Sequence, residues 1–202
     1  MRAVHAIQYM SAIRRVLAHG PAILKHTNSR LDVQQAERAV DALVCCEGKR
    51  YFTGLGKSGH AAARMASSLS SIGLPSHFIH GAEWAHGEFG AIERGDIIFG
   101  VSQSGRTLEL IDLMDRTSTI PIDFIALTGN PESALARRAD VALTCAVPDD
   151  AELLGILPTA SVLAAHHVFN SILSECAERL QLKPEDIGRH HPGGSIGRTL
   201  EK

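Results

Sequence analysis

Two short turns of the sequence carry the residue types that bind a phosphate group. One, residues 54–59 (GLGKSG), joins a short apolar segment to an alanine-rich helical segment, and the other, residues 102–105 (SQSG), follows a second apolar segment directly. Serine hydroxyls and the free N–H groups at a helix start can surround a phosphate monoester without a metal ion. We expect Ser58 to cap the first helix, while Ser102, Ser104 and Thr107 flank the start of the second. The two turns therefore predict a phosphate site.

Two better-known motifs do not fit residues 54–59. The glycines satisfy the letters of the dinucleotide fingerprint, but that motif also needs an acidic residue at the end of the next strand, which ends at His80. A P-loop would need a glycine at position 51, which is Tyr51. We therefore expect neither a dinucleotide cofactor nor a nucleoside triphosphate at this turn.

A parallel sheet is the framework that the sequence predicts for these turns. Short apolar segments that read as strands occur at residues 51–53, 76–79, 96–101, 122–127 and 141–146. Because they alternate with helical segments, we expect one α/β domain over residues 1–202: a flavodoxin-like, three-layer sandwich with a five-stranded parallel sheet of order 2-1-3-4-5. In such a sheet, ligands bind beyond the carboxyl ends of strands one and three, where the order reverses. Both turns fall there.

The remaining helical segments predict self-association. An amphipathic helix is expected over residues 3–17, a second over 30–46 with Asn28 or Ser29 as its cap, and a long one over 159–180. Residues 148–158 read as irregular, and residues 190–198 as a glycine-rich polar tail. The two N-terminal helices and the face of the helix over residues 59–72, which is rich in Ala and Ser, offer more packing surface than one sheet needs to cover, and we therefore expect a homotetramer.

Composition narrows the function classes. A net charge of −2 gives no reason to expect nucleic acid or an anionic membrane surface as a partner. No apolar run is long enough to span a bilayer and no signal-peptide layout is seen, so a cytoplasmic protein is expected. The four cysteines lack metal-ligand spacing and are expected as free thiols. His77 and His80 would face opposite sides of a strand, and neither they nor His86 are expected to bind a metal.

Several separated motifs together resemble the sugar isomerase (SIS) domain family. Besides the two turns, they are AEWAHG at 82–87, LTG at 127–129, RRAD at 137–140, GILPT at 155–159 and HPGG at 191–194. More narrowly, the chain resembles the arabinose-5-phosphate isomerases, which interconvert ribulose 5-phosphate and arabinose 5-phosphate for Kdo and lipopolysaccharide synthesis. The resemblance covers about residues 30–200. Many relatives carry two CBS domains after the isomerase domain, and we expect this chain, which ends at Lys202, to lack them.

The resemblance also implies roles for individual residues. Phosphate contacts carry over to Ser58, Ser102, Ser104 and Thr107, and catalytic roles to Lys57, His86, Glu109 and His191. A family glutamate ahead of the GILPT segment falls on Asp150, although Glu152 is near enough to compete. Two departures bear on which sugar is used: Arg106 stands where the family often has an acidic residue, and the helix after Pro158 has fewer Ser and Thr than is usual.

An aldose–ketose isomerase needs a base that moves a proton between C1 and C2, a group that stabilises the enediolate, and an acid–base group for ring opening. Glu109 or a carboxylate of the 148–158 segment could be the base, and the Lys57 cation would neutralise enediolate charge. The two site histidines could relay protons, and His191 is expected to reach the site of a neighbouring subunit. No cofactor is needed. The alternatives are an isomerase of another sugar phosphate, such as a hexulose phosphate, and a non-catalytic sugar-phosphate sensor.

Overall fold

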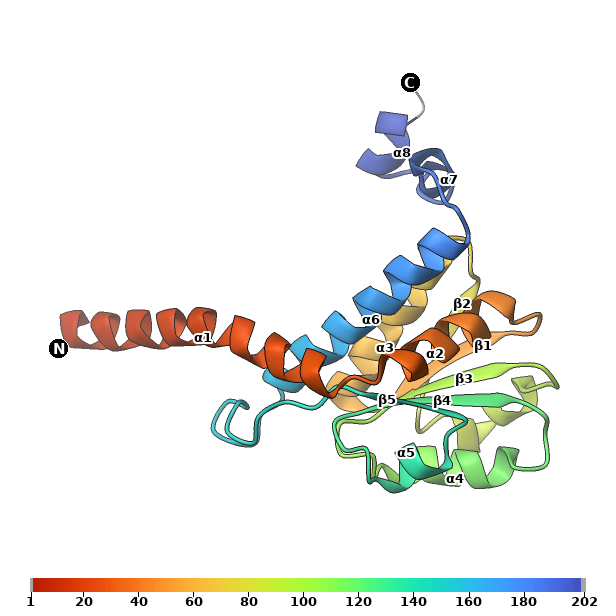
Figure 1. The fold of residues 1–202 in the computed structure, drawn as a ribbon, viewed down its shortest axis with the longest axis horizontal. Helices are drawn as coiled ribbons and strands as arrows, with labels where there is room; N and C mark the ends of the chain where they lie inside the picture. The colour runs from red at the N-terminus through yellow and green to blue at the C-terminus, as the bar shows by residue number, and fades with distance from the viewer. Residues whose placement is uncertain (1, 201–202) are drawn as a thin grey trace.

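The chain is built around a sheet of five parallel strands. The computed structural model describes residues 2–200, with the side chains of residues 11–198. The strand order is β2-β1-β3-β4-β5, which confirms the predicted fold (Figure 1). The strands are β1 (Arg50–Gly54), β2 (Ser76–His80), β3 (Ile97–Val101), β4 (Asp123–Thr128) and β5 (Val141–Thr144). Because the order reverses between β1 and β3, their carboxyl ends flank the switch point.

Helices cover both faces of this sheet (Figure 1). The helices on one face are α2 (Val33–Cys45), α3 (Gly56–Ser71) and α6 (Ala160–Arg179), and α2 and α3 each pack against α6. The elements on the other face are η1 (Trp84–His86), η2 (Glu88–Ala91), α4 (Leu108–Thr117) and α5 (Ala134–Arg138). The result is the three-layer arrangement that the alternation of strands and helices predicts.

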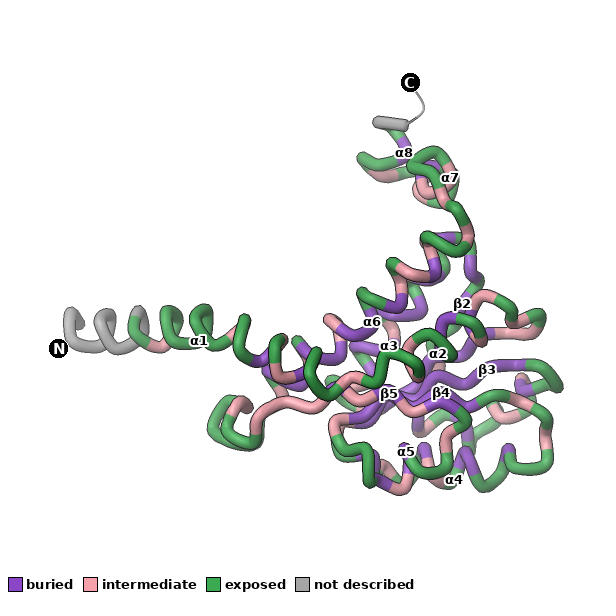
Figure 2. Tube along the Cα trace, in the orientation of Figure 1, coloured by how far each residue is buried: buried purple, intermediate pink, exposed green. Residues whose placement is uncertain are grey.

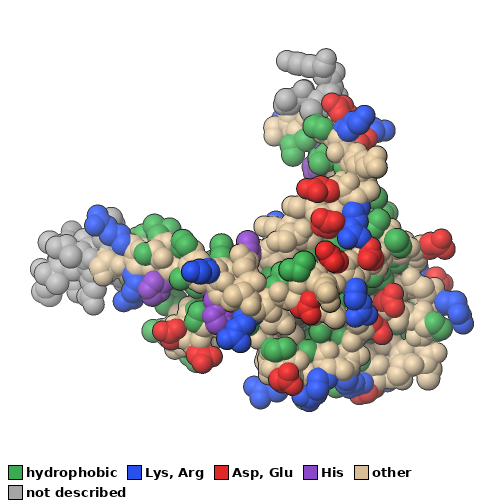
Figure 3. All heavy atoms as spheres, viewed as in Figure 1, with side chains coloured by type: hydrophobic (Ala, Val, Ile, Leu, Met, Phe, Trp, Pro, Cys, Tyr) green, Lys and Arg blue, Asp and Glu red, His purple; other side chains and the backbone are tan. Residues whose placement is uncertain are grey.

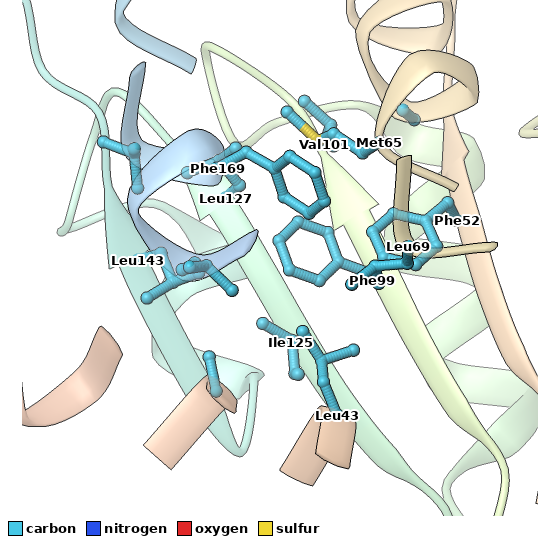
Figure 4. Packing of buried hydrophobic residues seen from close by; sticks show 14 of the residues in the cluster. Leu43, Phe52, Met65, Leu69, Phe99, Val101, Ile125, Leu127, Leu143 and Phe169 are labelled. Atoms are coloured by element: carbon cyan, nitrogen blue, oxygen red, sulfur yellow. The ribbon is translucent and has the colours of Figure 1, made fainter. Parts of the chain in front are cut away.

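Alternate strand residues supply two separate cores, one on each face. On β1, Phe52 points toward α3 and α6, whereas Tyr51 points toward η1 and α4. The rings of Phe52 and Phe99 stack at 4.8 Å between centroids, and Phe169 of α6 meets both edge-on (Figure 4). All three phenylalanines are fully buried, and the burial continues along the sheet (Figure 2). This core fixes the start of α6 relative to the strand ends.

The first helix is longer than the sequence predicts. α1 (Arg2–Arg30) continues past residue 17 with Pro21 inside it, and its first half projects from the body of the molecule (Figures 1 and 2). A proline removes one helical hydrogen bond. The helix continues because the turns after it are anchored: Ile23 is buried, and the Thr27 hydroxyl donates to the Ala146 carbonyl at 2.9 Å.

This continuation overturns the predicted cap of the second helix. Asn28 and Ser29 are helical residues of α1, so neither caps α2. The cap is Asp32, whose carboxylate accepts hydrogen bonds from the backbone N–H groups of Gln34 at 2.9 Å and Gln35 at 3.2 Å.

The tail beyond α6 contains two short helices, α7 (Pro184–Arg189) and α8 (Ser195–Leu200), rather than irregular chain alone. They extend past the end of α6 (Figure 1). The contact with the body includes His190, whose Nδ1 lies 3.1 Å from the carbonyl oxygen of Ser71 at the end of α3. Over residues 2–200, no helix combines the length and the apolar character that crossing a membrane requires.

Candidate active site

The turn after β3 is held in shape by its own hydroxyl groups. Ser102 is buried at the end of the strand, and its Oγ lies 2.7 Å from Oγ1 of Thr107 and accepts the Gly105 N–H at 3.1 Å. Gly105 has a φ of +61°, and an added Cβ would overlap the Ser133 side chain. Both facts require glycine. The turn therefore presents a fixed set of hydroxyl and N–H groups at the start of α4, as an anion site needs.

The turn after β1 brings the start of α3 against the neighbouring strand. A Cβ on Gly54 would lie 2.9 Å from the carbonyl oxygen of Val101, and one on Gly59 would lie 2.8 Å from the carbonyl oxygen of Gly54. Lys57 is exposed in the first turn of α3. Ser58 is not the cap that the sequence predicts, because the helix begins at Gly56 and Leu55 occupies the cap position. Ser58 instead lies half-buried within the first turn.

Both turns meet in one small hollow at the carboxyl edge of the sheet. Its volume is about 30 Å³, and its lining residues include Lys57 and Ser58 from α3, Gln103 from the turn after β3, Cys145 after β5 and Ser161 from α6. The predicted switch point therefore brings Lys57, Ser58 and Gln103 together. Ser102, Ser104 and Thr107 belong to the same turn as Gln103 but do not line this hollow. A wider hollow of about 620 Å³ lies elsewhere, beside β5, and none of the predicted site residues lines it.

The Gln103 side chain has a defined place in the floor of this hollow. Its Oε1 lies 3.8 Å from the Cys145 thiol, and any Cβ on Gly129 would overlap its amide group. Its backbone carbonyl accepts the Gly129 N–H at 3.0 Å. Burial raises the pKa of the Cys145 thiol to about 12, which makes it a neutral part of the floor.

Glu109 lies in the first turn of α4, next to the segment that carries His86. Glu109, Ala82, Trp84 and Ala85 line a hollow of about 50 Å³. The Trp84 indole N–H donates to the Thr53 hydroxyl at 2.9 Å, which fixes this segment to β1. His86 is exposed in η1. The structure thus places Glu109 and the His86 segment side by side.

The two carboxylates before α6 differ in their surroundings. Asp150 is exposed, whereas the Glu152 carboxylate caps α6 by accepting hydrogen bonds from the N–H groups of Thr159 at 2.6 Å, Ala160 at 3.0 Å and Ser161 at 3.1 Å. Partial burial opposes ionisation, but the hydrogen bonds outweigh it and hold the pKa of Glu152 below its ordinary value. Glu152 is therefore a structural cap.

His191 lies far from the other predicted site residues of the same chain. It follows α7, and its Nδ1 is 2.8 Å from the carbonyl oxygen of Ile187. Its neighbour His190 contacts the carboxyl end of α3, whereas Lys57 lies at the amino end of that 16-residue helix. Such a helix is about 24 Å long. One chain therefore does not bring His191 to Lys57.

Comparison with protein-family models identifies the family of this chain. The SIS domain model matches residues 43–174. The chain belongs to the SIS domain family. This SIS domain is 33% identical over 191 residues to the arabinose 5-phosphate isomerase KpsF of Escherichia coli, covering 95% of the chain and 58% of that protein. It is 36% identical over 163 residues to the arabinose 5-phosphate isomerase KdsD of Pseudomonas aeruginosa, covering 81% and 50%. The chain thus spans 50–58% of the length of these relatives.

A solved structure supports the same family assignment. The SIS domain superposes on an Escherichia coli CFT073 protein in complex with arabinose 5-phosphate with a TM-score of 0.85 and 26% identity, over 92% of this chain and 98% of that one. The resemblance to the arabinose-5-phosphate isomerases is therefore confirmed, and no CBS domain is found within the 202 residues.

Two polar side chains that line the hollow of this SIS domain, Gln103 and Ser161, were not among the predicted site residues. Gln103 stands inside the SQSG turn and could have been found from its position at the switch point. Ser161 belongs to the helix start after Pro158, whose Ser and Thr content the sequence comparison noted, but only the three-dimensional start of α6 places its side chain in the hollow. Among the described residues, no group of three or more His, Cys, Asp and Glu side chains is arranged to hold a metal ion.

Proposed function

We propose that this SIS domain is an aldose–ketose isomerase that interconverts ribulose 5-phosphate and arabinose 5-phosphate. The observation that carries the proposal is that the two turns approach each other at the switch point of the sheet, where Lys57 and Ser58 of the first and Gln103 of the second line one hollow. The second turn also carries the paired hydroxyls of Ser102 and Thr107. The arabinose 5-phosphate complex of the Escherichia coli CFT073 protein supports the choice of substrate. The product would serve Kdo and lipopolysaccharide synthesis in the cytoplasm.

The phosphate of the substrate binds the turn after β3. Ser102, Ser104 and Thr107 supply hydroxyls, and the first N–H groups of α4 supply the positive end of a helix dipole. Ser58 approaches from the other turn. Because the Ser102 and Thr107 hydroxyls already lie 2.7 Å apart, little rearrangement is needed when the anion arrives.

The isomerisation itself moves one proton within the substrate. With arabinose 5-phosphate in its open-chain form, Glu109 or Asp150 removes the proton at C2, and the electron pair shifts to give a C1–C2 double bond with negative charge on the C1 oxygen. The Lys57 ammonium group stabilises that charge. Return of the proton to C1, and transfer of the O2 proton to the C1 oxygen through His86 or His191, gives the ketose. No electrons leave the substrate, so no redox cofactor is needed.

We further propose that the enzyme is a homotetramer in which His191 serves the site of a neighbouring copy. His191 lies at the opposite end of α3 from Lys57, which leaves the single-chain site without it. On the projecting half of α1, Ile13, Val16 and Leu17 are 54%, 64% and 72% exposed, and hydrophobic side chains gather there in Figure 3. An exposed apolar helix face of this kind fits an interface between copies.

The test is proton exchange at C2 of the substrate. Purified protein is incubated with arabinose 5-phosphate in deuterated water, and NMR follows both loss of the C2 proton signal and appearance of ribulose 5-phosphate. We expect both, and we expect Glu109→Gln to slow both. Tight binding of the sugar phosphate without exchange or product would overturn the isomerase and support a sensor. Exchange with a hexulose phosphate alone would overturn the choice of sugar.

A further inference from the structure

The hydroxyl group of Ser161 is buried without a hydrogen-bond partner. Ser161 is 3% exposed, and among the described residues its Oγ is the one buried side-chain oxygen or nitrogen that lacks a partner. The hydroxyl is near enough to the Glu152 carboxylate to lower its pKa, yet no hydrogen bond of normal geometry joins the two. An unpaired buried polar group is costly, so a protein that retains one commonly uses it.

The position of Ser161 connects this hydroxyl to the candidate active site. Ser161 is the second residue of α6 and lines the hollow that Lys57, Ser58 and Gln103 also line. The hollow measures about 30 Å³, which is enough for a hydroxyl group or a water molecule but not for a whole sugar. It can therefore serve as a subsite for one small polar group.

The charge at the start of α6 decides which kind of group fits. The N–H groups of Thr159, Ala160 and Ser161, which would otherwise attract an anion, are already bound by the Glu152 carboxylate. A phosphate placed there would meet this negative charge, whereas a neutral hydroxyl would not. The Ser161 oxygen can accept a hydrogen bond, and the Gln103 amide can donate one. The subsite therefore suits the polyol part of a sugar phosphate.

We propose that Ser161 determines substrate specificity by accepting a hydrogen bond from one sugar hydroxyl that enters this hollow. The proposal rests on the sugar-phosphate site described above and deepens it, because it separates the subsite for the polyol from the turn that holds the phosphate. Ser161 acts in binding and orientation; the proton transfers belong to other residues.

The experiment compares Ser161→Ala with a matched control, Ser174→Ala, on the same helix. The Ser174 hydroxyl is exposed and donates to the Asn170 carbonyl at 2.9 Å, away from the hollow. Titration calorimetry measures binding of arabinose 5-phosphate, ribulose 5-phosphate, fructose 6-phosphate and inorganic phosphate. For the sugar phosphate that the wild type binds most tightly, we expect Ser161→Ala to weaken binding by about 3- to 10-fold, the value of one hydrogen bond. Inorganic phosphate should bind unchanged, and Ser174→Ala should match the wild type.

A thermal scan of the ligand-free protein excludes a merely structural role. Because the hydroxyl has no partner without ligand, Ser161→Ala should keep or slightly raise the Tm. Unchanged sugar-phosphate affinity, or an equal loss for inorganic phosphate with a lowered Tm, would overturn the proposal, as would a wild type that binds none of the three sugar phosphates. If the isomerase proposal alone fails, the result is different: sugar-phosphate binding still depends on Ser161, but the protein does not exchange the C2 proton of the substrate.

Discussion

Replacing Glu152 by glutamine should destabilise the fold without removing a catalytic group. In the wild type, one carboxylate oxygen accepts N–H groups of Thr159 and Ala160, and the other accepts that of Ser161. A glutamine keeps one acceptor oxygen and turns an NH₂ group toward at least one N–H group. One unsatisfied N–H costs about 1–3 kcal/mol, and loss of the charge at the helix start costs about 0.3–1 kcal/mol more. We therefore expect a loss of about 2–3 kcal/mol, or roughly 5–10 °C in Tm for a chain of this size.

The effect of Glu152→Gln should depend on pH in a defined direction. Because the folded-state pKa of Glu152 is lowered, its stabilisation is fully present above the pKa of the unfolded chain and is lost as the pH falls through the folded value. The Tm difference between wild type and variant should therefore be constant near neutral pH and shrink in acid, below about pH 4. Differential scanning calorimetry at fixed protein concentration measures both.

Asp150→Asn is the matched comparison, since Asp150 is an exposed carboxylate two residues earlier in the same segment. Its Tm should stay within about 1–2 °C of the wild type, as for most surface substitutions. If Asp150 contributes to proton transfer, its kcat should fall while that of Glu152→Gln, measured below its Tm, should not. A Glu152→Gln protein as stable as the wild type at pH 7 would refute the capping argument.

Four further results are expected. Ser104→Ala should raise KM more than it lowers kcat in steady-state assays, because a phosphate contact binds substrate and transition state alike; a pure kcat loss would contradict this. Glu109→Gln should lower kcat by about 10²- to 10⁴-fold with little change in KM, and near-normal kcat would remove it from the chemistry. Gly105→Ala should destabilise the protein by about 1–3 kcal/mol in thermal scans, since its φ is +61°. Inactive Lys57→Ala and His191→Ala subunits, mixed and reassembled, should regain about a quarter of wild-type activity if sites are shared between copies, and none if they are not.

The sheet could be predicted from sequence because its signals are local. Each strand is a short apolar run bounded by turn residues, and two glycine-containing turns sit where the strand order reverses. The observed ends of β1 and β3 differ from the predicted ends by at most one residue, so both turns lie where the sequence predicts them. The meeting of Lys57, Ser58 and Gln103 follows from topology alone.

The parts that sequence could not supply depend on contacts between distant segments. α1 passes Pro21 because Thr27 is held by the Ala146 carbonyl, 119 residues away in sequence. Glu152 caps α6 from seven residues before the first N–H that it binds, which no short capping pattern predicts. The remoteness of His191 from Lys57 in one chain appears only once the lengths and directions of α3 and α6 are known.

The protonated state of Cys145 gives the candidate site an internal reporter. With its pKa raised to about 12, this buried thiol has almost no thiolate at neutral pH, whereas Cys45 is exposed. Alkylating reagents should therefore modify Cys45 rapidly and reach Cys145 only when α6 or the strand ends separate. The labelling rate of Cys145 then measures how often the floor of the hollow opens. Ligands that bind in the hollow should slow this labelling in proportion to their occupancy.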